Sequence, residues 1–133
     1  DRAIIGEGAE IYGEVYNSVI GCGVTIGEGT VVRDSIIMNN TSIGAGGEVN
    51  KAIIAENVLV GDNVKLGVGE EVDNETAPHI YNQGLVTIGE KSIIPDGISV
   101  GKNSVVAGVT TYDDYENNYL PSGRALLKAG GEK

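Results

Sequence analysis

The stretch "VIGCGVTIGEGTVV" (residues 19–32) contains nearly the same six-residue unit twice. Ile20 and Ile26 are each followed directly by a glycine, and by a second glycine two positions later. Aliphatic residues continue this rhythm along the chain at Ile5, Ile20, Ile26, Ile37, Ile43, Ile54, Val60, Leu66, Ile88, Ile94, Val100 and Val106. A fixed short period of this kind is the signature of a repeat architecture.

The position three residues after each aliphatic residue is also restricted. In ten of the twelve units it is Gly or Asn, namely Gly8, Gly23, Gly29, Asn40, Gly46, Asn57, Asn63, Gly69, Gly97 and Asn103. Gly and Asn tolerate a positive φ better than other residues do. Each unit therefore predicts a short strand with one inward aliphatic side chain, followed by a tight turn.

A longer repeat contains three of these units. Residues 18–34, 35–51 and 52–68 align with a period of 17, and residues 3–17 form a shorter turn before them. Three short strands per turn predict a solenoid with three faces, whose turns stack as parallel strands about 4.8 Å apart. Each turn begins with a small residue, which predicts a crowded column at Ala3, Ser18, Ser35 and Ala52. The same register predicts a surface pair between Asp34 and Lys51.

The repeat resembles the left-handed parallel β-helix, so we expect an all-β hexapeptide-repeat solenoid. We assign residues 1–110 to the β-helix and residues 111–133, which are polar and rich in Tyr, to a C-terminal cap or tail. The rhythm is interrupted near residues 73–84, either by a degenerate turn or by a loop that leaves the solenoid. Because the chain begins within the repeat, we interpret it as part of a longer protein.

Composition narrows the class of function. The chain of 133 residues contains 21 Gly, no Phe and no Trp, so its core must consist of Ile and Val. A formal charge of −10 disfavours binding to nucleic acid or to an anionic membrane. One cysteine excludes an intrachain disulfide and is typical of a reducing compartment, so we expect a cytoplasmic protein. We find no signal peptide and no apolar run long enough to span a membrane.

Two segments resemble a known enzyme family more closely. "KAIIAENVLVGDNVKLG" (51–67), a polar break and "YNQGLVTIGEKSIIPDG" (81–97) are similar in content and order to the C-terminal domain of ADP-glucose pyrophosphorylases. That resemblance implies a parent enzyme of glycogen synthesis, which joins ATP and glucose 1-phosphate to give ADP-glucose and pyrophosphate. It places catalysis, ATP and Mg²⁺ in an N-terminal nucleotidyltransferase domain, so we expect no catalytic residue, metal site or cofactor in this chain.

The resemblance implies two roles for the chain itself. These are assembly, with its own catalytic domain and with identical or related subunits, and a share in allosteric control by sugar phosphates or nucleotides. Plant-type members carry activator-contacting lysines at the positions of Glu56 and Glu90, where an acidic side chain would repel a phosphate. The cations left as candidate effector ligands are Arg33, Lys51, Lys91 and Arg124.

The residues leave other functions open. A hexapeptide acyltransferase would use His79, the single histidine, as a general base, although a role in loop packing fits that residue as well. A catalytically silent regulatory paralogue would share all these features. A γ-class carbonic anhydrase needs three histidines around Zn²⁺, so we reject it. Cys22 should lie exposed at a corner, where it lacks a partner that would activate the thiol.

One apolar row should face outward. Val19, Ile36 and Ile53 each precede an inward aliphatic residue, so strand alternation points them toward solvent. Stacked on successive turns, they would form a stripe of the kind that marks an interface. We predict that this stripe contacts another subunit or the catalytic domain.

Overall fold

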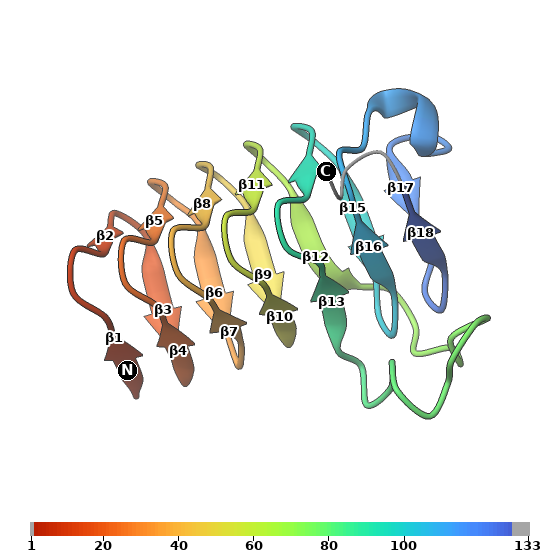
Figure 1. Ribbon diagram of the computed structural model, residues 1–133, viewed down its shortest axis with the longest axis horizontal. Helices are drawn as coiled ribbons and strands as arrows, with labels where there is room; N and C mark the ends of the chain where they lie inside the picture. Colours follow the sequence, from red (N-terminus) through yellow and green to blue (C-terminus); the bar gives the residue numbers. More distant parts are fainter. Residues whose placement is uncertain (1, 129–133) are drawn as a thin grey trace.

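The computed structural model describes residues 2–128, which wind into a solenoid of short parallel strands (Figure 1). Its strands form three sheets, one on each face of the prism. The first face consists of β1 (Ala3–Ile5), β4 (Ser18–Ile20), β7 (Ile36–Ile37), β10 (Ala52–Ile54), β13 (Val86–Ile88), β16 (Val105–Ala107) and β18 (Ala125–Leu127). The second consists of β2 (Glu10–Ile11), β5 (Thr25–Ile26), β8 (Ser42–Ile43), β11 (Leu59–Val60) and β14 (Ile93–Ile94). The third consists of β3 (Glu14–Tyr16), β6 (Val31–Arg33), β9 (Glu48–Asn50), β12 (Lys65–Val68), β15 (Ser99–Gly101) and β17 (Tyr119–Leu120).

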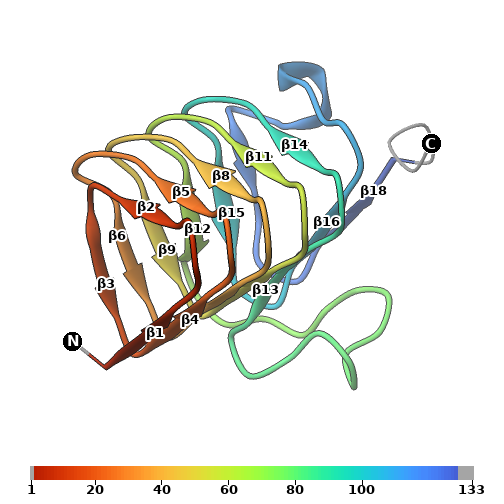
Figure 2. The ribbon, with the colours of Figure 1, turned by 60° about the vertical axis from the view of Figure 1, so that its left-hand side comes forward.

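The strand register confirms the predicted periods. Val19 pairs with Ile36 and Ile36 with Ile53, each 17 residues apart, whereas Ala3 pairs with Ser18 because the first turn is shorter. Seen from its N-terminal end, the chain runs counterclockwise as it recedes, so the solenoid is left-handed (Figure 2). The predicted fold, a left-handed parallel β-helix, is confirmed.

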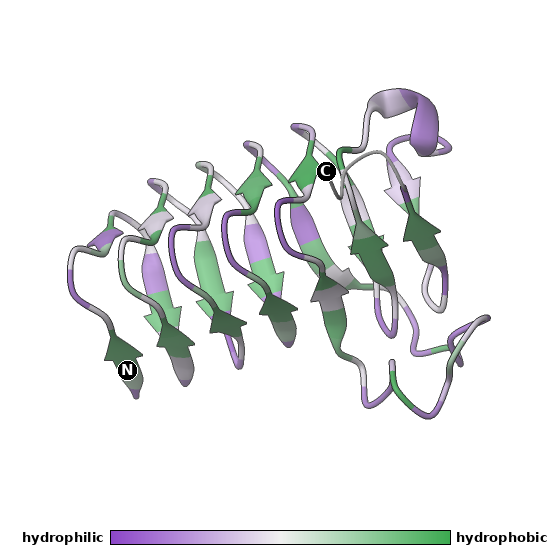
Figure 3. Cartoon of the chain, viewed as in Figure 1, coloured by the Kyte–Doolittle hydropathy of each residue, from purple (hydrophilic) through white to green (hydrophobic). Residues whose placement is uncertain are grey.

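The core is built from the aliphatic residues of the hexapeptide. Eleven of the twelve predicted inward residues are buried, with exposed fractions of 4% or less. The prediction is wrong for Ile5, which is 49% exposed, because β1 is the edge strand of its sheet. Figure 3 shows the hydrophobic strands of the first face running between polar corners.

The corners have the predicted backbone conformation. All ten Gly and Asn residues at the third position have a positive φ, between 57° and 82°. Lys91 occupies the same position in its unit and has a φ of 63°, although lysine is disfavoured in this region. Eleven of the twelve units thus share this corner geometry, and the exception is Val109, whose neighbour Gly108 has the positive φ instead.

The small residues that begin each turn have a role that the sequence did not reveal. Ser18 and Ser35 are buried as predicted, and their hydroxyls link consecutive turns. The N–H of Ser35 donates to Ser18 Oγ (3.0 Å) and that of Ala52 donates to Ser35 Oγ (3.0 Å). Ser18 and Ser35 thus combine a small volume with a hydrogen-bond acceptor, whereas Ala3 and Ala52 of the same column provide the small volume alone.

The predicted pair between Asp34 and Lys51 is wrong. Asp34 Oδ1 accepts a hydrogen bond from Asn17 Nδ2 (2.7 Å), and Lys51 Nζ donates to the carbonyl of Gln83 (2.7 Å). Although stacked in register, the two side chains have better partners elsewhere.

Residues 69–85, which we call the excursion loop, leave the solenoid and return to it (Figure 2). Strand β13, which follows this segment, pairs directly with β10 of the preceding turn. No further turn lies between these two strands, so the break is a loop and not a degenerate turn. Asn103, only 2% exposed, holds both arms of the loop. Its Nδ2 donates to the carbonyl of Val72 (3.0 Å), and its Oδ1 accepts from the N–H of Gly84 (2.7 Å). Asn74 Nδ2 adds a bond to the Asn103 carbonyl (2.8 Å).

The residues after 110, for which we predicted a cap or tail, add a final turn. Strands β17 and β18 pair with β15 and β16, and a 3-10 turn, η1 (Tyr112–Asp114), precedes them. Tyr115 covers the core beside this turn, and its hydroxyl shares a hydrogen bond with Thr110 Oγ1 (2.8 Å). Burial raises the pKa of Tyr115. Between residues 2 and 128, no helix is long and apolar enough to cross a bilayer.

The left-handed corner at Lys91 generates a first prediction. Replacing Lys91 by Gly should stabilise the protein by about 0.5–1 kcal/mol, because glycine removes the cost of a left-handed backbone. The matched control is Lys65→Gly, at an exposed position within β12, which should destabilise it by a similar amount. Urea denaturation of both variants measures the difference, and a loss of stability in Lys91→Gly would contradict the argument.

A second prediction concerns a buried hydroxyl. Thr41 Oγ1 donates to the carbonyl of Ala55 (2.7 Å) and accepts from the N–H of Val58 (3.1 Å). Thr41→Val leaves both backbone groups unpaired inside the solenoid and should cost about 1–3 kcal/mol. Thr41→Ser keeps the hydroxyl, so thermal unfolding should rank it above Thr41→Val. The reverse order would mean that the methyl group matters more than the hydrogen bonds.

Candidate functional site

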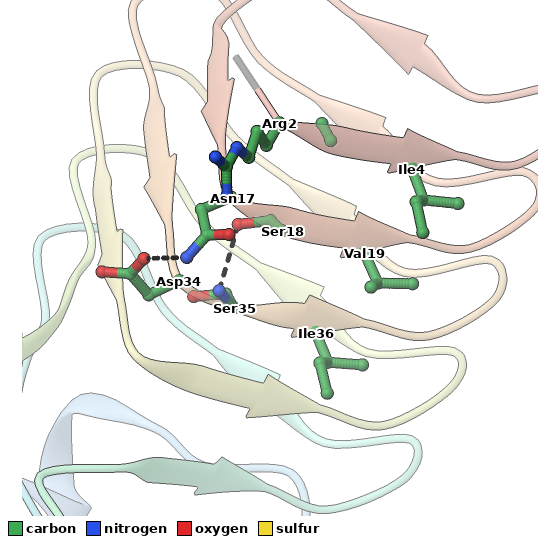
Figure 4. A pocket seen from close by; sticks show the side chains of 9 residues that line it. Arg2, Ile4, Asn17, Ser18, Val19, Asp34, Ser35 and Ile36 are labelled. Carbon is green, nitrogen blue, oxygen red and sulfur yellow. Dashed lines mark hydrogen bonds between the residues drawn. The ribbon is translucent and has the colours of Figure 1, made fainter.

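An apolar row projects from the N-terminal half of the first face. Ile4, Val19 and Ile36 are 70%, 42% and 42% exposed, and Ile53 continues the row as a half-buried residue. Figure 4 shows the first three side chains pointing the same way, each from a neighbouring strand. The predicted outward direction of Val19 and Ile36 is confirmed, and their role as an interface stays a prediction. We call Ile4, Val19, Ile36 and Ile53 the outer row.

A polar edge borders the outer row where the strands of the first face begin. Arg2, Asn17 and Asp34 lie along this edge, and with Ile4, Val19 and Ile36 they line an open hollow of about 520 Å³ (Figure 4). The bond from Asn17 to Asp34 orients the carboxylate along the edge. The hollow is thus apolar on one side and charged on the other.

The four predicted effector ligands do not converge. Arg33 ends β6, where its guanidinium lies 5.8 Å from the ring centroid of Tyr16. Arg124 lies at a corner of the last turn, immediately before β18. Lys91 lies at a different corner, where its N–H donates to the carbonyl of Glu56 (3.0 Å). Lys91 therefore lies next to Glu56 of the preceding turn and to its own sequence neighbour Glu90.

Lys51 has a partner that the sequence did not suggest. Lys51 and Lys102 line a second hollow, of about 280 Å³, at the base of the excursion loop, together with Asp34, Asn50, Gly67 and Gly84. A side chain at Gly84 would meet both lysines, with Lys51 Nζ at 3.7 Å and Lys102 Cδ at 3.9 Å from its Cβ. Lys51 has a left-handed backbone, with a φ of 52°. A predicted cation, Lys51, thus shares this hollow with a second cation, Lys102, and with the carboxylate of Asp34.

The repeat in the sequence could have identified one of the residues that the sequence analysis missed. Ile4 precedes Ile5 as Val19 precedes Ile20, so the outer row could have been extended by one turn from the repeat alone. Lys102 carries no such signal, because the irregular excursion loop hides from the sequence that Gly84 stacks between Asn50 and Lys102 in the strand register.

The residues of the rival functions lie apart from these hollows. His79 is exposed at the tip of the excursion loop, and within residues 2–128 no side chain donates to or accepts from its ring. Cys22 is exposed at a corner as predicted, where its N–H donates to Asn39 Oδ1 (2.9 Å). No three His, Cys, Asp or Glu side chains cluster in the part of the chain that the structure describes.

Comparison with known proteins identifies a family and several relatives to which this chain is similar. Residues 1–88 match the family model described as "GlmU-like, C-terminal hexapeptide". The glucose-1-phosphate adenylyltransferase of Lachnospira eligens is 58% identical over 98% of this chain, and that of Acetivibrio thermocellus is 41% identical over 97%. That of Thermotoga maritima is 46% identical over 94%. The chain spans only 31%, 30% and 30% of the length of these relatives.

The names of these relatives and the description of the family model agree with the fold of this chain. Glucose-1-phosphate adenylyltransferase is the enzyme also called ADP-glucose pyrophosphorylase, so the resemblance found in residues 51–97 is confirmed. The three parallel sheets are the structure that a hexapeptide repeat specifies. The chain belongs to the family of GlmU-like C-terminal hexapeptide domains.

Proposed function

We propose that this chain is the assembly and regulatory domain of a glucose-1-phosphate adenylyltransferase. The observation that carries the proposal is its identity of 58% over 98% of its length to one such enzyme. The parent reaction would join ATP and glucose 1-phosphate into ADP-glucose and pyrophosphate, a step of glycogen synthesis. In it, a phosphate oxygen of the sugar attacks the α-phosphorus of ATP, and the bond to the β-phosphate breaks.

We assign this chemistry to the catalytic portion of the longer protein. Nucleotidyl transfer depends on Mg²⁺ and on several cations that converge on the migrating phosphate. Among residues 2–128, Arg33, Lys91 and Arg124 lie on separate parts of the solenoid, and only Lys51 and Lys102 share a hollow. The glycines of residues 2–128 lie at the corners of the turns. ATP and Mg²⁺ would therefore bind outside this chain.

The solenoid would act as a rigid support with two surfaces left for docking. One is the outer row on the first face. The other is the N-terminal end of the prism, where Ile5 is exposed and the inward residues Ile11 and Val15 are only partly buried. A buried apolar contact at either place would fix the catalytic portion relative to the solenoid. We expect the assembled enzyme to bury both.

Regulation by an anionic effector would use the hollow that Lys51 and Lys102 share. Two lysines that line one hollow favour a phosphate over a neutral sugar, and Asp34, which lines it as well, reduces that preference. Lys51 also holds the excursion loop through Gln83, so an anion that engages Lys51 would act on the loop as well. Glu56 and Glu90 would keep the corner near Lys91 free of phosphate.

Pyrophosphate release tests the parent reaction. We expect the longer protein that contains this chain to release pyrophosphate from ATP and Mg²⁺ only when glucose 1-phosphate is present, and this chain alone to release none. Omission of the sugar phosphate is the control. A folded protein that releases no pyrophosphate would instead indicate a silent paralogue.

Effector response tests the regulatory role. In the longer protein, Lys51→Ala and Lys102→Ala should each raise the half-saturating concentration of a sugar bisphosphate, AMP or inorganic phosphate at least fivefold. The rate without effector should stay unchanged, because neither lysine takes part in catalysis. Lys65→Ala, on the third face, is the matched control. A response equal to that of the control would exclude this hollow as the effector site.

A further inference from the structure

We infer that Glu71, on the excursion loop, opposes through its charge the anion that would bind beside Lys51 and Lys102. The carboxylate would thereby raise the anion concentration at which this hollow fills. The inference rests on the proposed effector role of the hollow. It adds to the two residues that favour binding a third residue that limits it.

The hollow contains hydrogen-bond donors that the fold does not use. Lys51 Nζ spends one of its three N–H groups on the carbonyl of Gln83 (2.7 Å). The ammonium of Lys102 and the side-chain amide of Asn50 form no hydrogen bond within residues 2–128. An anion would therefore find free donors here without breaking a bond that holds the fold.

Glu71 lies beside these donors, although it is not among the residues that line the hollow. A Cβ at Gly84 would lie 3.5 Å from Glu71 Oε1. The same point is 3.7 Å from Lys51 Nζ and 3.9 Å from Lys102 Cδ. Three charged side chains thus border the space that Gly84 leaves open by lacking a side chain of its own.

The charge of Glu71 is not neutralised by a partner. Among residues 2–128, its carboxylate forms neither an ion pair nor a hydrogen bond, although two lysines are near. A phosphate in the space beside Gly84 would be attracted by both lysines and repelled by this carboxylate. A unit charge about 6 Å away, at a dielectric constant between those of a protein surface and bulk water, changes affinity about three- to tenfold.

The other carboxylates nearby are less able to oppose an anion. Asp34 lines the hollow, but its Oδ1 already accepts a hydrogen bond (2.7 Å). Glu75 Oε2 accepts a hydrogen bond from the N–H of Ala125 (3.0 Å) on the last turn. Glu70 and Asp73 contribute none of the three atoms that border the open space. Glu71 is therefore the carboxylate of the loop that is both near this space and unbonded.

Glu71 is not needed to hold the loop. Asn103 Nδ2 donates to the carbonyl of Val72, the residue after Glu71, and Asn103 Oδ1 accepts from the N–H of Gly84. These bonds fix the backbone on both sides of the open space. The exposed side chain of Glu71 can therefore swing away when an anion binds, and its charge can be removed without loosening the loop.

Titration of the isotope-labelled chain with inorganic phosphate tests the inference. NMR gives the dissociation constant from the amide signals of Gly84 and Lys102 at constant ionic strength. Glu71→Gln keeps the shape of the side chain and removes its charge, so phosphate should bind about three- to tenfold more tightly than to the unchanged chain. Glu70→Gln is the matched control, because it changes the net charge equally without touching the open space. It should change the affinity by less than about twofold.

Ionic strength separates charge from shape. The Debye length is about 10 Å at 0.1 M salt and falls as salt is added, so the advantage of Glu71→Gln should shrink. An advantage that stays constant as salt rises would mean that Glu71 acts by its bulk, which would overturn the inference. Circular dichroism of each variant confirms that the fold is retained.

Equal affinities of Glu71→Gln and Glu70→Gln would also overturn the inference. If Lys51→Ala then abolishes phosphate binding, the hollow remains an effector site and only the role of Glu71 fails. If neither the unchanged chain nor Glu71→Gln shows saturable shifts, the hollow and the role of Glu71 fail together. Neither result depends on pyrophosphate release, so the proposed parent reaction is tested separately.

Discussion

Each turn of this solenoid must return directly above its own start at the spacing of one β-strand. Parallel strands in register satisfy the backbone N–H and C=O groups only if three sharp corners close every turn in 17 residues or so. A sharp corner needs one residue in the left-handed region, and the chain supplies Gly or Asn there almost everywhere. The glycine content, the hexapeptide rhythm and the parallel sheets all follow from this single geometric constraint.

The inside of the prism leaves little room for chemistry. Ile, Val and Leu fill it, and the buried polar side chains at its corners, such as Ser18, Ser35 and Thr41, bond the backbone of the neighbouring turn. Within the described residues, no buried side-chain nitrogen or oxygen lacks a hydrogen-bond partner. Function must therefore depend on the outward positions and on the places where the repeat is broken.

The excursion loop is the main break, and it connects several of the features discussed above. Its base brings Lys51 near Lys102, its arms are held by Asn103, and its tip exposes Ile80. Regular turns place equivalent residues above one another, as in the hollow lined by Arg2, Asn17 and Asp34, and this stacking restricts which residues can meet. An inserted loop removes that restriction at the cost of ordering 17 residues, which the bonds from Asn74, Glu75 and Asn103 offset.

The sequence by itself determined the fold, the period, the inward and outward positions of the strands and the family resemblance. It could do so because, in a repeat, each residue packs against the equivalent residue of the next turn. The pattern along the sequence therefore predicts contacts in three dimensions. Only the tertiary structure decided that residues 69–85 form a loop, that Asp34 and Lys51 take separate partners, and that Lys51 meets Lys102. It also decided that Ile5 is exposed and that the chain after residue 110 completes a further turn. These features depend on the ends of the solenoid and on an irregular insertion, where a residue's neighbours come from folding and not from the period.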